Sequence, residues 1–129
     1  GRVILIEPAM GLIPRIIYKL FHHEPNGFNF KIDWDDQPNH LPDNEDYFAA
    51  QALSWRAFVN NELNYSKFFD LKSINCFSDF TYLGSGGFSF KAMYPKKLYP
   101  ILKNIDSILT KISKKIFAAR MIIVLEKKV

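Results

Sequence analysis

Residues 1–10, GRVILIEPAM, decide how the rest of the chain is interpreted. Residues 3–6 (VILI) form a continuous apolar run in which polar residues do not alternate with apolar ones. This pattern is typical of a strand that helices cover on both faces, as in the middle of a parallel sheet. Such a strand needs neighbouring strands, and the remaining sequence supplies few of them.

The composition indicates a single folded domain of a cytoplasmic protein. At 129 residues the chain is long enough to bury a core, and its 48% of hydrophobic residues exclude a disordered protein. No apolar run reaches the roughly 18 residues of a membrane span, and no signal peptide is recognisable. The single cysteine, Cys76, excludes an internal disulfide bond.

The first half of the chain is predicted to contain two helices. Apolar residues recur at helical spacing over residues 12–22, which we expect to pack back on the first strand. A second helix is expected to begin at Asp43 or Asn44, whose side chains favour the N-cap position, and to end at residues 60–61. The segment between these two helices holds three prolines and three aromatic residues and is expected to cover the surface as an irregular excursion.

The second half is predicted to contain two strands and one helix. Residues 74–82 alternate between two faces, as a half-covered strand does, and residues 121–125 (MIIVL) read as a second fully apolar strand. A helix is expected from about residue 95 or 100 to residue 115, with its apolar residues at helical spacing. The prediction is therefore an α/β fold of about three strands and three helices with an incomplete sheet.

Charge is distributed unevenly along the chain, although the net charge is only +4. Residues 24–46 contain seven acids and one lysine, whereas residues 91–129 contain ten basic residues and two acids. We expect the lysines of the last helix to line a solvent-exposed face and its isoleucines to face the core. An amphipathic basic helix on a membrane has the same pattern. Nucleic acid is not expected as a partner, and a membrane surface is the less favoured alternative.

Four segments carry a resemblance to a known family. They are GRVILIEP at residues 1–8, HHEP at residues 22–25, YLGSGGFS at residues 82–89 and FAARMIIVLEKK at residues 117–128. In this order they are similar to the C-terminal part of class I S-adenosylmethionine-dependent methyltransferases, in a group of bacterial enzymes. In that family a PGGR turn leads into an apolar fifth strand that ends in Glu-Pro.

The resemblance covers nearly the whole chain and implies a Rossmann-like fold. Residues 1–129 would be the C-terminal segment of the methyltransferase domain, with residues 23–73 as an insertion on the acceptor side. The strands missing from the sheet would lie N-terminal to Gly1. The parent enzyme would use S-adenosylmethionine as its cofactor and a small molecule as its methyl acceptor.

The resemblance also implies that this chain alone does not bind the cofactor. In the family a glycine-rich loop after the first strand and an acid after the second strand hold S-adenosylmethionine, and neither has a counterpart here. The glycine cluster at residues 84–87 follows an alternating strand and does not open a helix, so it does not match a dinucleotide fingerprint. No cofactor-binding residue is therefore predicted within this chain.

The candidate site residues follow the first strand. Ligands of open α/β sheets bind beyond the carboxyl ends of the strands, where Glu7 is expected to contact the acceptor. His22 and His23 are candidates for the catalytic base that an acceptor hydroxyl or amine needs, and Glu24 for holding the acceptor. The alternative for the histidine pair is a C-terminal helix cap that interacts with the helix dipole.

Further candidates for the acceptor pocket lie in two loops. Trp34, between acids, has the chemistry to stack on a sugar, and the alternative is a solvated acidic loop with one buried tryptophan. Ser85 and Gly86 are candidates for a turn that lines the pocket, and the alternative is a tight turn that requires positive φ. No metal site is predicted, because adjacent histidines diverge on a helix.

A non-catalytic role is the second hypothesis. A sheet that lacks strands exposes the backbone of its edge, and such an edge pairs readily with another chain. The alternative to a methyltransferase is therefore an interaction module that forms a homodimer through its sheet edge.

Overall fold

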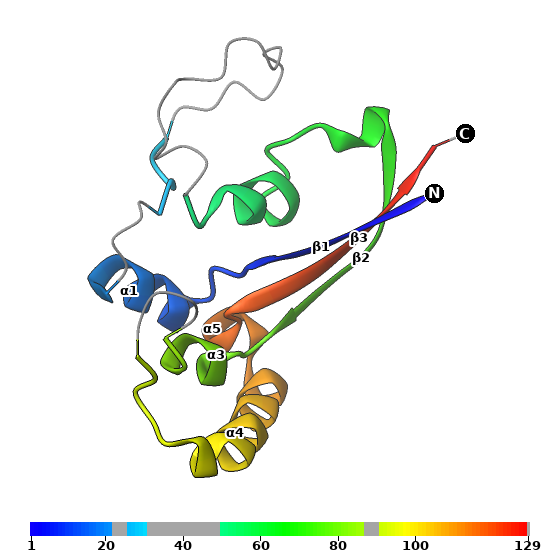
Figure 1. The fold of residues 1–129 in the computed structure, drawn as a ribbon. Coiled ribbons are helices and arrows are strands. Elements are labelled where there is room, and N and C mark those ends of the chain that lie inside the picture. Colours follow the sequence, from blue (N-terminus) through cyan, green and yellow to red (C-terminus); the bar gives the residue numbers. More distant parts are fainter. Residues whose placement is uncertain (22–25, 31–49, 87–90, 129) are drawn as a thin grey trace.

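The computed structural model describes residues 1–21, 26–30, 50–86 and 91–128. Strands β1 (Arg2–Pro8), β2 (Phe69–Phe77) and β3 (Arg120–Lys127) form the sheet, and the helices are α1 (Leu12–Phe21), α3 (Phe80–Gly84), α4 (Tyr99–Ile112) and α5 (Lys114–Phe117). Short turns of other helix types are η2 (Trp55–Val59), η3 (Tyr65–Lys67) and η4 (Lys96–Leu98). Figure 1 shows the sheet in the middle of the molecule, with α3, α4 and α5 gathered at one end of it.

The described strands form an antiparallel sheet with β3 at the centre. The strand order is β1-β3-β2, and β3 is antiparallel to both neighbours. Because both outer strands run antiparallel to β3, β1 and β2 run in the same direction. Their carboxyl ends therefore lie at the same end of the sheet. The prediction of a small α/β domain with about three strands is confirmed.

The core lies on one face of this sheet. Met121, Ile123 and Leu125 of β3 alternate inward and are almost fully buried. Leu5 and Ile74 are register partners of Ile123 and share its face. This face is covered by the segment around η2 and η3, which contributes three of the four aromatic side chains packed on the core: Trp55, Phe58, Tyr65 and, from β2, Phe69.

The other face of the sheet is open near β1. Ile4 and Ile6 point away from the core and are 65% and 59% exposed. Because β1 pairs with β3 alone among the described strands, it is an edge strand and not a central one. The prediction that helices cover this strand on both faces is therefore wrong for the described part of the chain.

The boundaries of β2 differ from the predicted strand at residues 74–82. The strand occupies Phe69–Phe77, and Phe80–Gly84 form the short helix α3 instead. The alternating pattern continues past residue 77, but the backbone N–H groups of Phe80 and Thr81 bond to the side chain of Asp106 and begin a helix. A contact distant in sequence thus overrides the local pattern.

The predicted second helix is described only at its end. Its expected start at Asp43 or Asn44 lies outside the described residues, whereas η2 ends at the C-cap Asn60. Asn61 has a φ of 58°, the left-handed conformation that terminates many helices, so the predicted end at residues 60–61 is confirmed.

Helix α4 lies where a helix was predicted, and Leu102 and Leu109 of its predicted apolar face lie inward, but the isoleucines of that face do not. Its isoleucines are exposed, whereas Asp106 is buried and Leu102, Leu109 and Thr110 are partly buried. The prediction that the isoleucines face the core is wrong. No helix among the described residues is long and apolar enough to cross a membrane.

The junction between β1 and α1 depends on a glycine. A Cβ atom on Gly11 would lie 2.8 Å from the backbone oxygen and 2.9 Å from the backbone nitrogen of Ala118. Because the backbone of Ala118, between α5 and β3, cannot move without disturbing both elements, we expect Gly11→Ala to lower the free energy of unfolding by about 1–3 kcal/mol. Urea denaturation measures this difference.

Gly1→Ala is the matched control, since a Cβ atom on Gly1 meets nothing within 4 Å. We expect the free energy of unfolding of this variant to differ from that of the wild type by less than about 0.5 kcal/mol. Equal stabilities of the two variants would contradict the packing of this junction.

Candidate functional site

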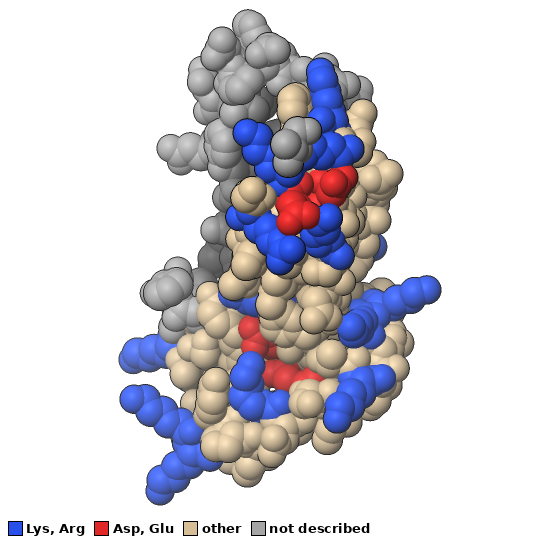
Figure 2. Space-filling view, turned by 90° about the vertical axis from the view of Figure 1, so that its right-hand side faces the viewer, with Lys and Arg blue, Asp and Glu red and all other residues tan. Residues whose placement is uncertain are grey.

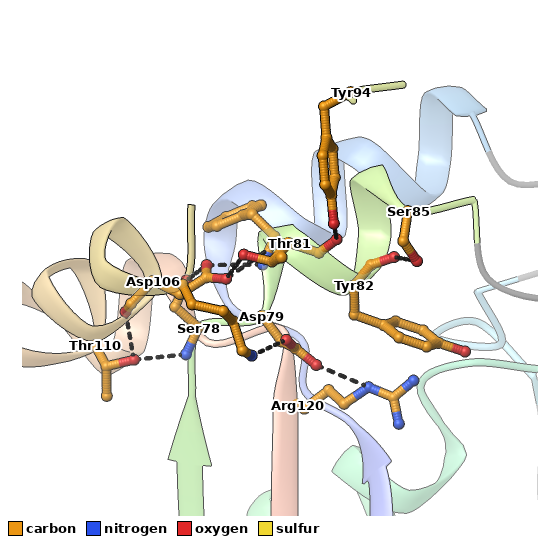
Figure 3. A network of polar contacts seen from close by, with 11 residues as sticks. Ser78, Asp79, Thr81, Tyr82, Ser85, Tyr94, Asp106, Thr110 and Arg120 are labelled. Atoms are coloured by element: carbon orange, nitrogen blue, oxygen red, sulfur yellow. Dashed lines mark hydrogen bonds and ion pairs between the residues drawn. The ribbon is translucent and has the colours of Figure 1, made fainter. Parts of the chain in front are cut away.

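Polar side chains gather at the end of the sheet where β1 and β2 terminate. Ser78 and Asp79 follow β2, and Arg120 begins β3 at the same end. Figure 3 shows how these residues meet side chains of α3 and α4 in one network. Because this network joins buried acids to partly exposed cations, it is the candidate site.

Asp106 of α4 is the centre of the network and is 3% exposed. One carboxylate oxygen accepts hydrogen bonds from Ser78 Oγ and from the backbone N–H of Phe80, both at 2.8 Å. The other oxygen accepts a bond of 2.9 Å from the Thr81 N–H and a further bond from the Thr81 hydroxyl. Asp106 therefore satisfies the first N–H groups of α3, which have no partners within that helix.

These hydrogen bonds determine the protonation of Asp106. Burial alone would raise the pKa of its carboxyl group, but the hydrogen bonds from Thr81, Ser78 and Phe80 outweigh burial and lower the pKa below 3.8. Thr110 extends the network, because its hydroxyl donates to the backbone oxygen of Asp106 and accepts from Ser78 N–H. At neutral pH the carboxylate is charged and fully engaged, so it is not a free acid or base.

Asp79 is the second buried acid, and it is paired with two cations. Its oxygens lie 3.0 Å from Lys103 Nζ and 3.4 Å from Arg120 Nε, and its side chain is 11% exposed. Burial disfavours the charged form of Lys103, but the hydrogen bond to Asp79 together with the attraction of nearby negative charges outweighs burial and raises the pKa of the lysine. Lys103 is therefore charged at neutral pH.

Arg120 connects the buried acids to the surface. Its guanidinium lies 3.9 Å from the ring centroid of Tyr82, a distance at which a cation is attracted to the face of an aromatic ring. Figure 3 shows Tyr82 and Arg120 side by side at the outer end of the network. Both side chains are partly exposed, as is that of Lys103, so a bound molecule can reach these three members of the network.

The structure describes two of the loop residues predicted to line a pocket. Ser85 Oγ donates a hydrogen bond of 2.7 Å to the backbone oxygen of Tyr82, and Gly86 follows with a φ of 81°. The prediction that a glycine here adopts positive φ in a tight turn is confirmed for Gly86. Tyr94 crosses back over α3 and donates from its hydroxyl to the backbone oxygen of Thr81.

Of the remaining predicted residues, Glu7 alone is described, and it is not brought to this network. Glu7 is the register partner of Met121, so its side chain lies on the core face of the sheet, opposite to that of Arg120. The predicted catalytic residues His22 and His23, together with Glu24 and Trp34, lie outside the described residues. Their roles remain predictions.

Sequence reasoning missed the residues that form the network. Asp79, Tyr82, Asp106 and Arg120 were not among the candidates, although one signal was present. Asp106 is the only acid between Asp79 and Glu126, in a helix otherwise rich in lysine. A lone acid in such a segment indicates a specific partner more often than a solvated position.

Neither a metal site nor an activated cysteine is found among the described residues. No group of three or more His, Cys, Asp or Glu among them is placed to hold a metal ion. Burial raises the pKa of the Cys76 thiol, so this cysteine is protonated at neutral pH and is not an activated nucleophile. The network therefore joins buried acids to three partly exposed side chains, those of Tyr82, Lys103 and Arg120.

Comparisons with known proteins found no match. No family model matches the chain, and no curated protein or solved structure does so either.

Asp106→Asn tests the centre of the network. The amide keeps one acceptor oxygen but replaces the other with a donor, which leaves buried donors of Thr81, or of Ser78 and Phe80, unsatisfied. We expect the free energy of unfolding to fall by about 1–3 kcal/mol at neutral pH. Asp70→Asn is the control, because the Asp70 side chain is 53% exposed, and we expect it to change stability by less than about 0.5 kcal/mol.

The same variant has a defined pH dependence. The pKa of Asp106 is lower in the folded chain than its ordinary value of 3.8, so the unfolded chain binds this proton more readily. The stabilisation is complete above about pH 5 and is lost as pH falls through the folded-state pKa. Urea denaturation over this range is expected to show that the free energy of unfolding of the wild type no longer exceeds that of Asp106→Asn below about pH 4. A difference that does not change with pH would contradict this role.

Proposed function

We propose that this chain forms the C-terminal part of a class I S-adenosylmethionine-dependent methyltransferase. It supplies the last strands of the Rossmann-like sheet and part of the cover of the acceptor pocket. The observation that carries the proposal is the strand order β1-β3-β2, in which an antiparallel β3 separates two strands that are parallel to each other.

This strand order agrees with the segments that carry the resemblance. In the class I methyltransferase fold the last strand runs antiparallel to the others and lies between the fifth and sixth strands. The resemblance assigns residues 1–8 to the fifth strand, which is β1. Strands β2 and β3 then take the sixth and last positions, and the order of the three supports the assignment.

The open edge of β1 also supports the proposal. Hydrogen bonds of 2.9 Å from Lys127 N to Gly1 O and from Ala9 N to Ala119 O show that odd-numbered residues of β1 bond to β3. Bonded positions alternate in an antiparallel pair, so Ile4 and Ile6 direct their backbone N–H and C=O groups to the open edge. A further strand of the parent enzyme would satisfy these groups.

In the proposal, this chain contributes no residue that binds the cofactor. The acid after β2, Asp79, is mostly buried between Lys103 and Arg120, so it is not free to bind the hydroxyl groups of a ribose. In the proposal, S-adenosylmethionine is held by the upstream part of the parent enzyme and supplies the methyl group. We therefore assign only acceptor-side roles to this chain.

Methyl transfer chiefly requires that the donor and the acceptor are aligned and that water is excluded. A base is required only when an acceptor hydroxyl or amine must lose a proton, and His22 or His23 is proposed for that step. Glu7, Glu24 and Trp34 are proposed to hold the acceptor. Ser85 and Gly86 are proposed to line its pocket at the end of α3.

The experiment is a calorimetric titration of S-adenosylmethionine into two proteins. One is this chain of 129 residues, and the other is the product of the same reading frame with any residues encoded upstream. We expect binding to the longer product and none to the shorter chain, because the cofactor loop is assigned to the upstream part. Absence of binding to both proteins would contradict the methyltransferase proposal.

The exposed edge favours a second candidate function, an interaction module that dimerises through β1. If this is correct, light scattering of the chain should show a mass that rises with concentration. Ile6→Pro removes an N–H that β3 does not use and is expected to abolish this rise while the fold persists. Leu5→Pro is the contrasting variant, because it removes a bond to β3 and is expected to destabilise the sheet. A wild-type chain that stays monomeric at high concentration would contradict the module.

A further inference from the structure

Helix α4 carries an exposed apolar ridge that the proposed function does not explain. The isoleucine ridge consists of Ile101, Ile105, Ile108 and Ile112, spaced by four, three and four residues so that they share one side of the helix. Their exposed fractions are 57%, 45%, 55% and 64%. Large apolar side chains that gather on one exposed side of a helix mark an interaction surface more often than an accident of packing.

The ridge is held outward by the other side of the helix. Asp106 is fixed by its hydrogen bonds to α3, and Lys103 is bonded to Asp79, so α4 cannot turn its isoleucines inward without breaking the network. The helix packs against α3, α5 and β2. Since β2 is at the opposite edge of the sheet from β1, strands added beside β1 would extend the sheet away from α4.

The surroundings of the ridge are strongly basic. Residues 91–115 contain seven lysines and a single acid, Asp106, which is buried and engaged. Lys96 and Lys97 lie before the helix and Lys115 after it, and Lys111 lies on it; all four are exposed and make no ion pair with any described residue. In Figure 2, blue side chains project around the lower part of the molecule, where Figure 1 places α4.

We propose that α4 binds the surface of an anionic lipid bilayer. The isoleucine ridge enters the boundary between headgroups and acyl chains, and the flanking lysines contact lipid phosphates. The charge of the surface thus complements that of the lipid, and the fluid acyl region accepts an apolar ridge of any shape.

A second copy of the chain is a poorer occupant of the ridge. Two α4 helices packed ridge against ridge would bring the lysines of both copies close together, with no exposed acid of either helix to neutralise them. Like charges at such a contact oppose association. Self-association through the ridge is therefore treated as an outcome that overturns the lipid proposal.

The experiment is sedimentation of the 129-residue chain with vesicles of two compositions. One is phosphatidylcholine alone, and in the other phosphatidylglycerol replaces part of it. We expect binding to the anionic vesicles only, weakening as the salt concentration rises from about 0.05 M to about 0.5 M because salt screens the lysines.

Two variants assign the contact to α4. Ile105→Gln combined with Ile108→Gln is expected to weaken binding to anionic vesicles by at least about tenfold, because two apolar side chains no longer enter the bilayer. Lys96→Gln combined with Lys97→Gln is expected to weaken binding and to flatten its dependence on salt. All four side chains are exposed, and circular dichroism verifies that each variant folds.

Ile4→Gln combined with Ile6→Gln is the matched control, because these isoleucines are at least as exposed as Ile105 and Ile108 but lie on the sheet. Retained binding of this control with lost binding of the α4 variant supports the proposal. The proposal is overturned if the chain does not bind anionic vesicles, if control and α4 variant lose binding equally, or if the α4 variant instead dissociates a dimer of the free chain.

Discussion

The carboxylate of Asp106 determines how the second half of this chain is arranged. It accepts hydrogen bonds from Ser78, Phe80 and Thr81, residues that lie 25 to 28 positions away in the sequence. Hydrogen bonds to a charged group contribute about 1.5–3 kcal/mol each, and their loss would leave buried donors without partners. Inward burial of the isoleucines of α4 would require all of these bonds to break. The polar contact therefore decides which side of the amphipathic helix faces the protein.

The end of β2 and the position of Arg120 follow from the same contact. Once the N–H groups of Phe80 and Thr81 turn toward Asp106, the strand cannot continue, and Asp79 is left between Lys103 and Arg120. The guanidinium of Arg120 then lies against Tyr82, at the end of the sheet where β1 also terminates. The candidate site is thus a consequence of how α3 and α4 are joined, and its exposed residues are positioned by buried ones.

The sequence predicted those parts of the fold that depend on local pattern. The apolar runs at residues 3–6 and 121–125 are strands, and residues 12–21 form a helix, because each pattern is set within a few neighbouring residues. Ser85 and Gly86 were identified from their local turn chemistry. By contrast, three features depend on contacts between residues far apart in the sequence, which periodicity does not reveal. They are the end of β2, the side of α4 that faces the protein and the role of Asp106. The exposure of Ile4 and Ile6 was missed for a related reason, since a continuous apolar run does not say which of its faces is covered within this chain.

The two apolar surfaces left exposed by this fold require different partners. Beside Ile4 and Ile6 of β1 there are backbone N–H and C=O groups without partners among the described residues, so an occupant must supply a strand as well as an apolar surface. The isoleucine ridge has no such requirement, because the backbone of α4 is satisfied within the helix. It needs an apolar medium bounded by negative charge. Since β1 and β2 are at opposite edges of the sheet and α4 packs against β2, both surfaces can be occupied at the same time. Completion of the sheet and attachment to a lipid surface are therefore compatible functions of one chain.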